Sequence, residues 1–244
     1  MQPYGEWLDR NLVELKDLKI PNERVIEHRG EDLSRLQKAF GYTYESTKDT
    51  ILPMARNGAE SIAAMGIDSP IPVLSKDQQP LFNYFKQLFA QVTNPPIDCI
   101  REEVVTSTTT YIGKDGNLLE EKAINCQVLK IHNPILTNTD LMKIRSMKRE
   151  GFKVVTLPIT YYKNTSLQKA LDHLFVEADR AHKDGANILI LSDRGVDENH
   201  VAIPSLLAVA GLNQHLVETK KRTSLAVILE SGEPRDRKST RLNS

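Results

Sequence analysis

The second half of the chain alternates short apolar segments with longer amphipathic ones, and this order constrains the fold more than any other feature. Three apolar segments rich in β-branched residues begin about 35 residues apart, at residues 152–159, 187–191 and 223–229. Between them, residues 166–183 and 203–217 carry apolar side chains at helical spacing. Strands joined by helices in this order form right-handed βαβ units around a parallel sheet. We therefore predict an α/β fold, and the spacing suits part of a (β/α) barrel and an open doubly wound sheet equally.

Residues with known roles at helix ends support these boundaries. Ser166 is a suitable N-cap for the first of the two helices, and Gly185 is a suitable stop after it. Pro204 falls in the first turn of the second helix, where its missing N–H costs little. In the first half of the chain, residues 33–40 indicate another helix that ends at Gly41.

The rest of the first half is less regular. Residues 1–50 are charged and weakly periodic, and we interpret them as a connector that packs on something larger. A helix is predicted over residues 48–57, followed by an irregular segment rich in glycine and proline. Further along, β-branched residues and turn residues predict a strand, a turn and a returning strand over residues 102–110, 114–117 and 125–131.

Residues 84–103 join an aromatic run, a double proline and a charged cluster. The helical spacing of the aromatic run predicts one apolar helix face, made of Phe82, Phe85, Leu88 and Phe89. Asn94, Pro95 and Pro96 then require an extended loop, because each proline lacks an N–H and restricts the residue before it. The loop ends in a charged cluster of Asp98, Arg101, Glu102 and Glu103. This cluster is either a general acid/base pair beside an anchoring arginine or an interface ion-pair network, and we favour the interface.

Two short polar motifs follow predicted strands, at the edge where parallel α/β folds build their sites. Ser192-Asp193-Arg194 follows the second strand and offers either an acid and a base or an ion pair that orders the loop. Ser231-Gly232-Glu233 follows the third strand and offers either backbone N–H groups for a phosphate or a plain turn. We favour the ion pair that orders the loop for the first motif. For the second motif we favour the plain turn, because neither a GxGxxG nor a GxxxxGK[ST] motif occurs.

Composition argues against several classes of protein. The chain has 32 basic and 32 acidic residues, and this zero net charge does not suit a dedicated nucleic-acid binder. No apolar run approaches the roughly 18 residues of a membrane span, and no signal pattern begins the chain. Cys99 and Cys126 are too few for a disulfide scaffold, which favours a reduced cytoplasmic setting. The 6 histidines lack metal-ligand spacing, so we expect no metal site.

Ordered segments along most of the chain carry a family resemblance. They are Phe40-Gly41-Tyr42-Thr43, Ala64-Met65-Gly66, Asp68-Ser69-Pro70, Val73-Leu74-Ser75, the stretch 84–103, Asn133-Pro134-Ile135-Leu136, Leu189 to Arg194, Ile203 to Ala208 and Glu230 to Glu233. Together they resemble the central domain of the large subunit of glutamate synthase, over residues 3–235.

The resemblance implies a rudimentary (β/α) barrel and a division of the chain into three parts. Residues 1–50 would be the connector after an amidotransferase domain, and residues 51–235 would be the central α/β domain. Residues 236–244 would be a foreign or disordered tail, because the resemblance stops at Arg235. In the family, this domain joins a glutaminase domain to an FMN-binding synthase domain and helps to wall an ammonia tunnel.

The resemblance also implies that the chemistry lies in other domains of a parent enzyme that makes glutamate from glutamine and 2-oxoglutarate. The family's nucleophilic cysteine, FMN site and iron–sulfur cluster belong to those domains, so we predict no catalytic, cofactor or metal residue in this chain. The expected partners are the flanking amidotransferase and FMN-binding domains, and the family allows a small NADPH-oxidising subunit as well. The electron donor is not specified by this region. We expect interdomain or structural roles for Asn94, Pro95, Pro96, Asp98, Arg101, Glu102, Glu103, Ser192, Asp193, Arg194, Ser231, Gly232 and Glu233.

Two alternatives stay open at this point. The first is a free-standing (β/α) enzyme that binds FMN or another phosphate-bearing cofactor at Ser192 and Ser231. The second is a regulatory binding module with an exposed apolar face.

Overall fold

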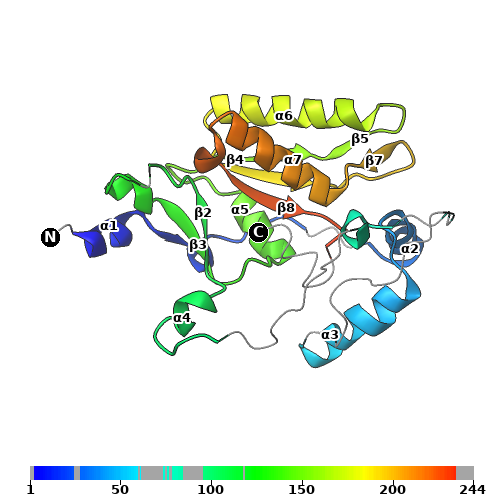
Figure 1. The fold of residues 1–244 in the computed structure, drawn as a ribbon, viewed down its shortest axis with the longest axis horizontal. Coiled ribbons are helices and arrows are strands. Elements are labelled where there is room, and N and C mark those ends of the chain that lie inside the picture. The colour runs from blue at the N-terminus through cyan, green and yellow to red at the C-terminus, as the bar shows by residue number, and fades with distance from the viewer. Residues whose placement is uncertain are drawn as a thin grey trace.

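A parallel sheet lies at the centre of the computed structural model (Figure 1), which describes residues 3–24, 28–59, 61, 74, 76, 79–84, 96–117 and 119–234. The sheet contains β4 (Val154–Pro158), β6 (Ile188–Ser192) and β8 (Ala226–Glu230), in that order. Its connections are the helices α6 (Leu167–Lys183) and α7 (Ser205–Glu218). The predicted α/β fold is confirmed, and these elements lie where the apolar periodicity placed them. Closure of the sheet into a barrel stays a prediction.

The ends of α6 are formed by the residues that the sequence indicated. The hydroxyl of Ser166 accepts the backbone N–H of Lys169 at 3.4 Å and so caps the first turn. At the other end, Gly185 has a φ of +88°, and the N–H of Ala186 bonds back to the carbonyl of Ala181 at 2.9 Å. This left-handed glycine ends the helix and directs the chain into β6.

The side chains of β6 enter two separate hydrophobic cores. Leu189 and Leu191 are fully buried in the core that the sheet shares with α6 and α7. Ile188 and Ile190 are fully buried in a second core on the opposite face of the sheet. This alternation has the two-residue period of a strand, and burial on both faces explains why the segment is continuously apolar.

A second sheet and one helix cover the opposite face of the parallel sheet. The sheet consists of β1 (Val13–Glu14), β3 (Val128–Ile131) and β2 (Thr110–Gly113), with β1 parallel and β2 antiparallel to β3. The helix is α5 (Asn138–Arg145), and its buried side chains join the second core. The predicted returning strand is confirmed as β3. The sequence did not indicate β1, which brings part of the expected connector into the fold.

The strand predicted over residues 102–110 is wrong for most of its length. Residues Glu102–Val105 form the short helix α4, and β2 begins only at Thr110. Asp98 explains the difference, because its carboxylate accepts the backbone N–H of Arg101 at 2.9 Å and closes a turn that continues into α4. The two valines of α4 are exposed, so their strand propensity has no sheet face to act on.

The first half of the chain supplies most of the remaining helices. The helix α2 (Gly30–Ala39) confirms the helix predicted before Gly41. The helix predicted over residues 48–57 is present as the π-helix η2 (Ser46–Ile51) followed by α3 (Leu52–Asn57), and α1 (Tyr4–Asn11) precedes β1. Short 3-10 helices are found at η1 (Leu15–Asp17), η3 (Leu81–Tyr84), η4 (Ala123–Cys126) and η5 (Arg222–Ser224).

Some predictions fall on parts of the chain that lie outside the described residues. The predicted aromatic helix overlaps η3 at Phe82, and Phe85, Leu88 and Phe89 lie outside. The tail at residues 236–244 also lies outside. Within the part that is described, no helix combines the length and the apolar character that crossing a membrane requires.

A small antiparallel ribbon follows the ends of β4 and β6. It pairs β5 (Thr160–Tyr162) with β7 (His200–Ala202). The N–H of Ile159 donates to the carbonyl of Ser192 at 2.8 Å, which connects the start of the ribbon to the end of β6. The ribbon was not predicted, and it lies at the edge of the sheet that holds the candidate site.

Candidate functional site

The ends of β6 and β8 meet because these strands are parallel neighbours in register. Ser192 lies opposite Glu230 in this register, so the residues that follow the two strands emerge side by side. The two polar motifs that the sequence indicated are therefore brought together, and hydrogen bonds connect them. We call the group the strand-end cluster, which comprises Ser192, Asp193, Arg194, Glu230, Ser231, Gly232 and Glu233.

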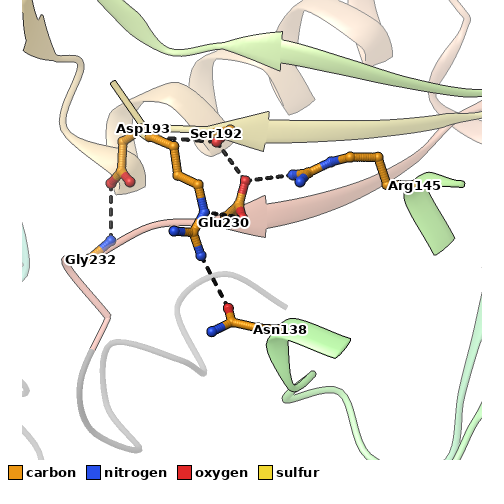
Figure 2. Close-up of polar contacts among 7 residues, drawn as sticks. Asn138, Arg145, Ser192, Asp193, Glu230 and Gly232 are labelled. Carbon is orange, nitrogen blue, oxygen red and sulfur yellow. Dashed lines mark hydrogen bonds and ion pairs between the residues drawn. The ribbon is translucent and has the colours of Figure 1, made fainter. Parts of the chain in front are cut away.

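Glu230 is the centre of the polar contacts in the strand-end cluster (Figure 2). One carboxylate oxygen accepts the hydroxyl of Ser192 at 2.6 Å and the guanidinium of Arg145 at 2.7 Å. The other oxygen accepts Nε of Arg194 at 2.5 Å, and Arg194 also donates to Asn138 at 3.1 Å. The Glu230 side chain is only 10% exposed, so two guanidinium groups pair with a carboxylate that is largely shielded from water.

The partners of Glu230 keep it ionised. Burial opposes its charge, but the hydrogen bonds from Ser192 and Arg194 and the charges of both arginines outweigh burial, so the pKa of Glu230 lies below its ordinary value. A carboxylate held in this way is a poor general acid. A largely buried carboxylate thus pairs with two arginines that are partly exposed, and these ion pairs join β6, β8 and α5.

Asp193 has the opposite electrostatic character. Its side chain accepts the N–H of Gly232 at 3.1 Å, and the residue is only 6% exposed. Burial raises the pKa of Asp193 to about 6, with smaller opposing contributions from the hydrogen bonds of Ser231 and Gly232, while nearby Glu233 and Glu230 raise it further. A carboxyl group that titrates near neutrality can act as a general base. Its contacts are with the protein's own backbone and hydroxyl groups, which suits a structural role.

The side chain of Glu233 lies at the N-terminus of α7. Its carboxylate accepts both the backbone N–H and the hydroxyl of Ser205, each at 2.6 Å. Helix N-termini attract anions through their free N–H groups and the helix dipole. The anion at this helix is therefore a side chain of the same chain.

The contacts of the strand-end cluster do not favour the phosphate-binding alternative. The N–H of Gly232 donates to Asp193, and the N–H of Glu233 donates to the hydroxyl of Ser231 at 3.1 Å. A phosphate at Ser192 and Ser231 would have to displace these bonds. It would also lie beside three acidic side chains, whose charges would repel it.

The charged cluster at the end of the proline loop lies apart from the strand-end cluster. Figure 1 places α4 on the side of the second sheet, away from the end of β8. Asp98 forms an exposed ion pair with Arg101, and the hydrogen bond from the backbone of Arg101 lowers the pKa of Asp98. Glu102 and Glu103 lie in the exposed first turn of α4. Pro96 is exposed, and Asn94 and Pro95 lie outside the described residues.

Several residues of the site were missed by the sequence reasoning. Glu230 formed part of the family resemblance, but its polar role was not predicted. The signal available for that role was an acidic residue at the end of an apolar strand. Arg145 and Ser205 reach the cluster from α5 and α7, and Tyr42 donates to the carbonyl of Gly232 at 2.8 Å from beyond α2. Their sequence separations from the partners are 85, 28 and 190 residues, so no local pattern could indicate them.

Metal chemistry finds no support in the described ranges. No group of three histidine, cysteine, aspartate or glutamate side chains in them could hold a metal ion. Cys99 is exposed and Cys126 is half-buried. The strand-end cluster thus consists of paired carboxylates, hydroxyls and guanidinium groups that hold strands and helices together.

Most of the chain matches one protein family, because residues 35–242 match the family described as "Glutamate synthase central domain". The chain belongs to this family. The resemblance inferred from the sequence motifs is thereby confirmed.

Three relatives illustrate the extent of the similarity. The glutamate synthase [NADPH] large chain of Bacillus subtilis (strain 168) is 41% identical over 96% of this chain and 15% of its own length. Ferredoxin-dependent glutamate synthase 2 of Synechocystis sp. is 38% identical over 95% of this chain and 15% of its own length. Glutamate synthase [NADH] of Schizosaccharomyces pombe is 35% identical over 96% of this chain and 12% of its own length. This glutamate synthase central domain therefore spans only 12–15% of the curated relatives that it matches.

Proposed function

We propose that this glutamate synthase central domain links a glutaminase domain to an FMN-binding synthase domain and helps to form the ammonia tunnel between them. The parent is then an oxidoreductase that makes glutamate from glutamine and 2-oxoglutarate. FMN and an iron–sulfur cluster are bound by its other domains, and the flanking amidotransferase and FMN-binding domains are the direct partners. We place this enzyme in the cytoplasm, with a small NADPH-oxidising subunit as a further partner where NADPH is the donor.

The observation that carries the proposal is the difference in length between this chain and its relatives. About 95% of the chain matches glutamate synthases that are several times longer, so one domain of a large enzyme is the simplest interpretation. The relatives are named for NADPH, NADH and ferredoxin. A domain shared by proteins with three different donors is suited to a task that does not involve the donor.

The physical task of a linking domain is geometric. Ammonia released into water would be protonated and would diffuse away, so the two reaction centres must stay aligned around a shielded path. The strand-end cluster supports this role, because its charged groups connect β6, β8, α5 and α7 through internal bonds. Such cross-connections stiffen a domain that must hold its neighbours in place.

The loop before α4 and the two valines of α4 support the proposal in a different way. Ile100, Val104 and Val105 are 86%, 79% and 59% exposed. Exposed apolar side chains in a group are typical of surfaces that another domain covers. We propose that residues 94–103 contact a flanking domain, while residues 192–194 and 231–233 support the domain or its borders.

Activity assays on the purified chain test this proposal. We expect neither glutaminase activity nor 2-oxoglutarate-dependent redox activity, because the reaction centres belong to other domains. Measurable turnover in either assay, abolished by a variant of Asp193, would show that the chain carries chemistry of its own.

Titration with FMN tests the alternative of a free-standing cofactor enzyme. A ligand that binds only the folded state raises the melting temperature in a saturable way. We expect the melting curve and the visible spectrum of the purified chain to be the same with and without FMN. A saturable shift of several degrees would require a cofactor site and would overturn the linking proposal.

A further inference from the structure

Gly232 is held from three directions by residues that are distant in the sequence. Its N–H donates to Asp193 at 3.1 Å, and Figure 2 shows the Asp193 carboxylate directed at this amide. Its carbonyl accepts the hydroxyl of Tyr42 at 2.8 Å, across 190 residues. The ring of Phe40 lies so close that a Cβ added to Gly232 would be 3.0–3.2 Å from three ring atoms.

Phe40 and Tyr42 are placed by the way in which α2 ends. Gly41 has a φ of +67°, and the N–H of Tyr42 bonds back to the carbonyl of Gln37 at 2.8 Å. This left-handed ending fixes the residues on either side of Gly41 relative to the helix. The two rings therefore move with α2, which Figure 1 shows beside the end of β8.

The other side of Gly232 is equally well fixed. Asp193 is buried, and its own N–H donates to the carbonyl of Glu230 at 3.1 Å. Directly after Gly232, Glu233 is bonded to Ser205 at the start of α7. The short segment that leaves β8 is thus bonded to β6, to α7 and to the residues that follow α2.

We propose that Phe40, Tyr42, Asp193 and Gly232 form a latch that fixes the segment leaving β8 against the end of α2. The latch joins the end of α2 to the segment after β8 at Gly232. The N–H and the carbonyl of this glycine are both hydrogen-bonded, and the Phe40 ring lies where a side chain would be. Its consequence rests on the proposed function. In the parent enzyme, the latch would set the position of whatever precedes α2 relative to whatever follows Glu233.

Amide hydrogen exchange on Tyr42→Phe tests the latch in the 244-residue chain. The substitution removes one hydroxyl and keeps the ring. We expect the amides of position 42 and of Gly232 to exchange about fivefold faster together, which is the factor for one hydrogen bond of ordinary net strength. The amides of Leu189 and Leu191 should keep their rates. Tyr44→Phe is the matched control, because Tyr44 is 70% exposed.

Three results would overturn the latch. The first is unchanged exchange at Gly232, and the second is faster exchange confined to position 42. The third is an equal acceleration of exchange at the β6 amides, because the substitution would then have lowered the stability of the whole fold and not opened a local latch. Gly232→Ala provides a second variant, because its Cβ must displace Phe40, and position 42 should again lose protection. Gly5→Ala is its control, since a Cβ there meets no atom within 4 Å.

The outcomes of this test and of the functional test are separable. Failure of the exchange experiment removes the latch and leaves the linking role intact. Binding of FMN by the chain would remove the linking role, and the latch would remain as a property of the fold.

Discussion

Glu233 caps a helix that begins 28 residues before it, by accepting both the N–H and the hydroxyl of Ser205 at 2.6 Å. Ser205 is the first residue of α7 and is only 1% exposed. The residue at the usual capping position is Pro204, which supplies no side-chain cap. The end of β8 therefore completes a helix whose own N-terminal sequence lacks a cap.

Glu233→Ala should lower the free energy of unfolding by about 1–2 kcal/mol, because it removes a cap and leaves a buried N–H and hydroxyl without their partner. Urea denaturation followed by circular dichroism measures this loss. Glu198→Ala is a matched control, because Glu198 is exposed and should change stability by less than about 0.5 kcal/mol. Equal effects of the two substitutions would contradict the capping role.

The cap illustrates which parts of this fold could be predicted from the sequence. The buried strands and α6 followed from local periodicity, and Ser166 and Gly185 followed from the chemistry of helix ends. Strand direction then placed Ser192 and Ser231 at one edge. The cap on Ser205 could not be predicted, because it comes from a separate strand end and depends on tertiary packing.

Asp193→Asn should change how stability depends on pH. Burial raises the pKa of Asp193 in the folded state from 3.8 to about 6. Between these two pH values the folded state binds more protons than the unfolded state, so wild-type stability falls as the pH rises. The neutral amide of asparagine does not titrate, so burying it carries no such pH-dependent cost. Thermal unfolding from pH 4 to pH 7 should show the variant gaining up to about 3 kcal/mol relative to wild type. Parallel profiles for the two proteins would refute the burial effect.

Asp197→Asn should give a pH dependence of stability, relative to wild type, with the opposite slope. It therefore serves as a control for replacing an aspartate by an asparagine. Hydrogen bonds from the backbone of Asn199 and from His200 lower the pKa of Asp197. Its contribution to stability is therefore present above the unfolded pKa and is lost as pH falls. The variant should be less stable than wild type near neutrality, and the difference should vanish in acid. A slope of the same sign as that of Asp193→Asn would show that neither profile reports its own carboxyl group.

The parts of the fold that the sequence did not indicate share a physical cause. β1 is two residues long, and β5 and β7 are three residues each. Such strands are stabilised by non-local partners, so their composition carries little signal. At α4, the capping of the turn by Asp98 outweighed the strand propensity of the valines. Arg145 was missed for the same reason as β1, because its partner Glu230 is 85 residues away.

Glu230→Gln should destabilise the fold by about 2 kcal/mol, since it removes the charge that Arg145 and Arg194 share in a largely buried site. The pKa of Glu230 is lowered, so this stabilisation is present above its ordinary value of 4.5 and is lost as pH falls through the folded pKa. Chemical denaturation at pH 7 and in acid should show the gap closing. Glu177→Gln breaks an ion pair with the exposed Arg180 and should cost under 1 kcal/mol. A gap that persists in acid would point to lost packing instead of lost charge.

Ile100→Asp should separate the proposed interdomain contact of the loop before α4 from any contribution of this loop to folding. Ile100 is 86% exposed, so the melting temperature of the isolated chain should stay nearly unchanged. In the full-length protein, a charge at a covered apolar surface would weaken interdomain contact and loosen the ammonia path. We therefore expect more ammonium released to solution per glutamine hydrolysed, and less glutamate formed. Val176→Asp, at a 55% exposed position on α6, is the matched control. Equal ammonium release from the two variants would contradict a contact between the loop and a flanking domain, because a general effect of added surface charge would then explain both results.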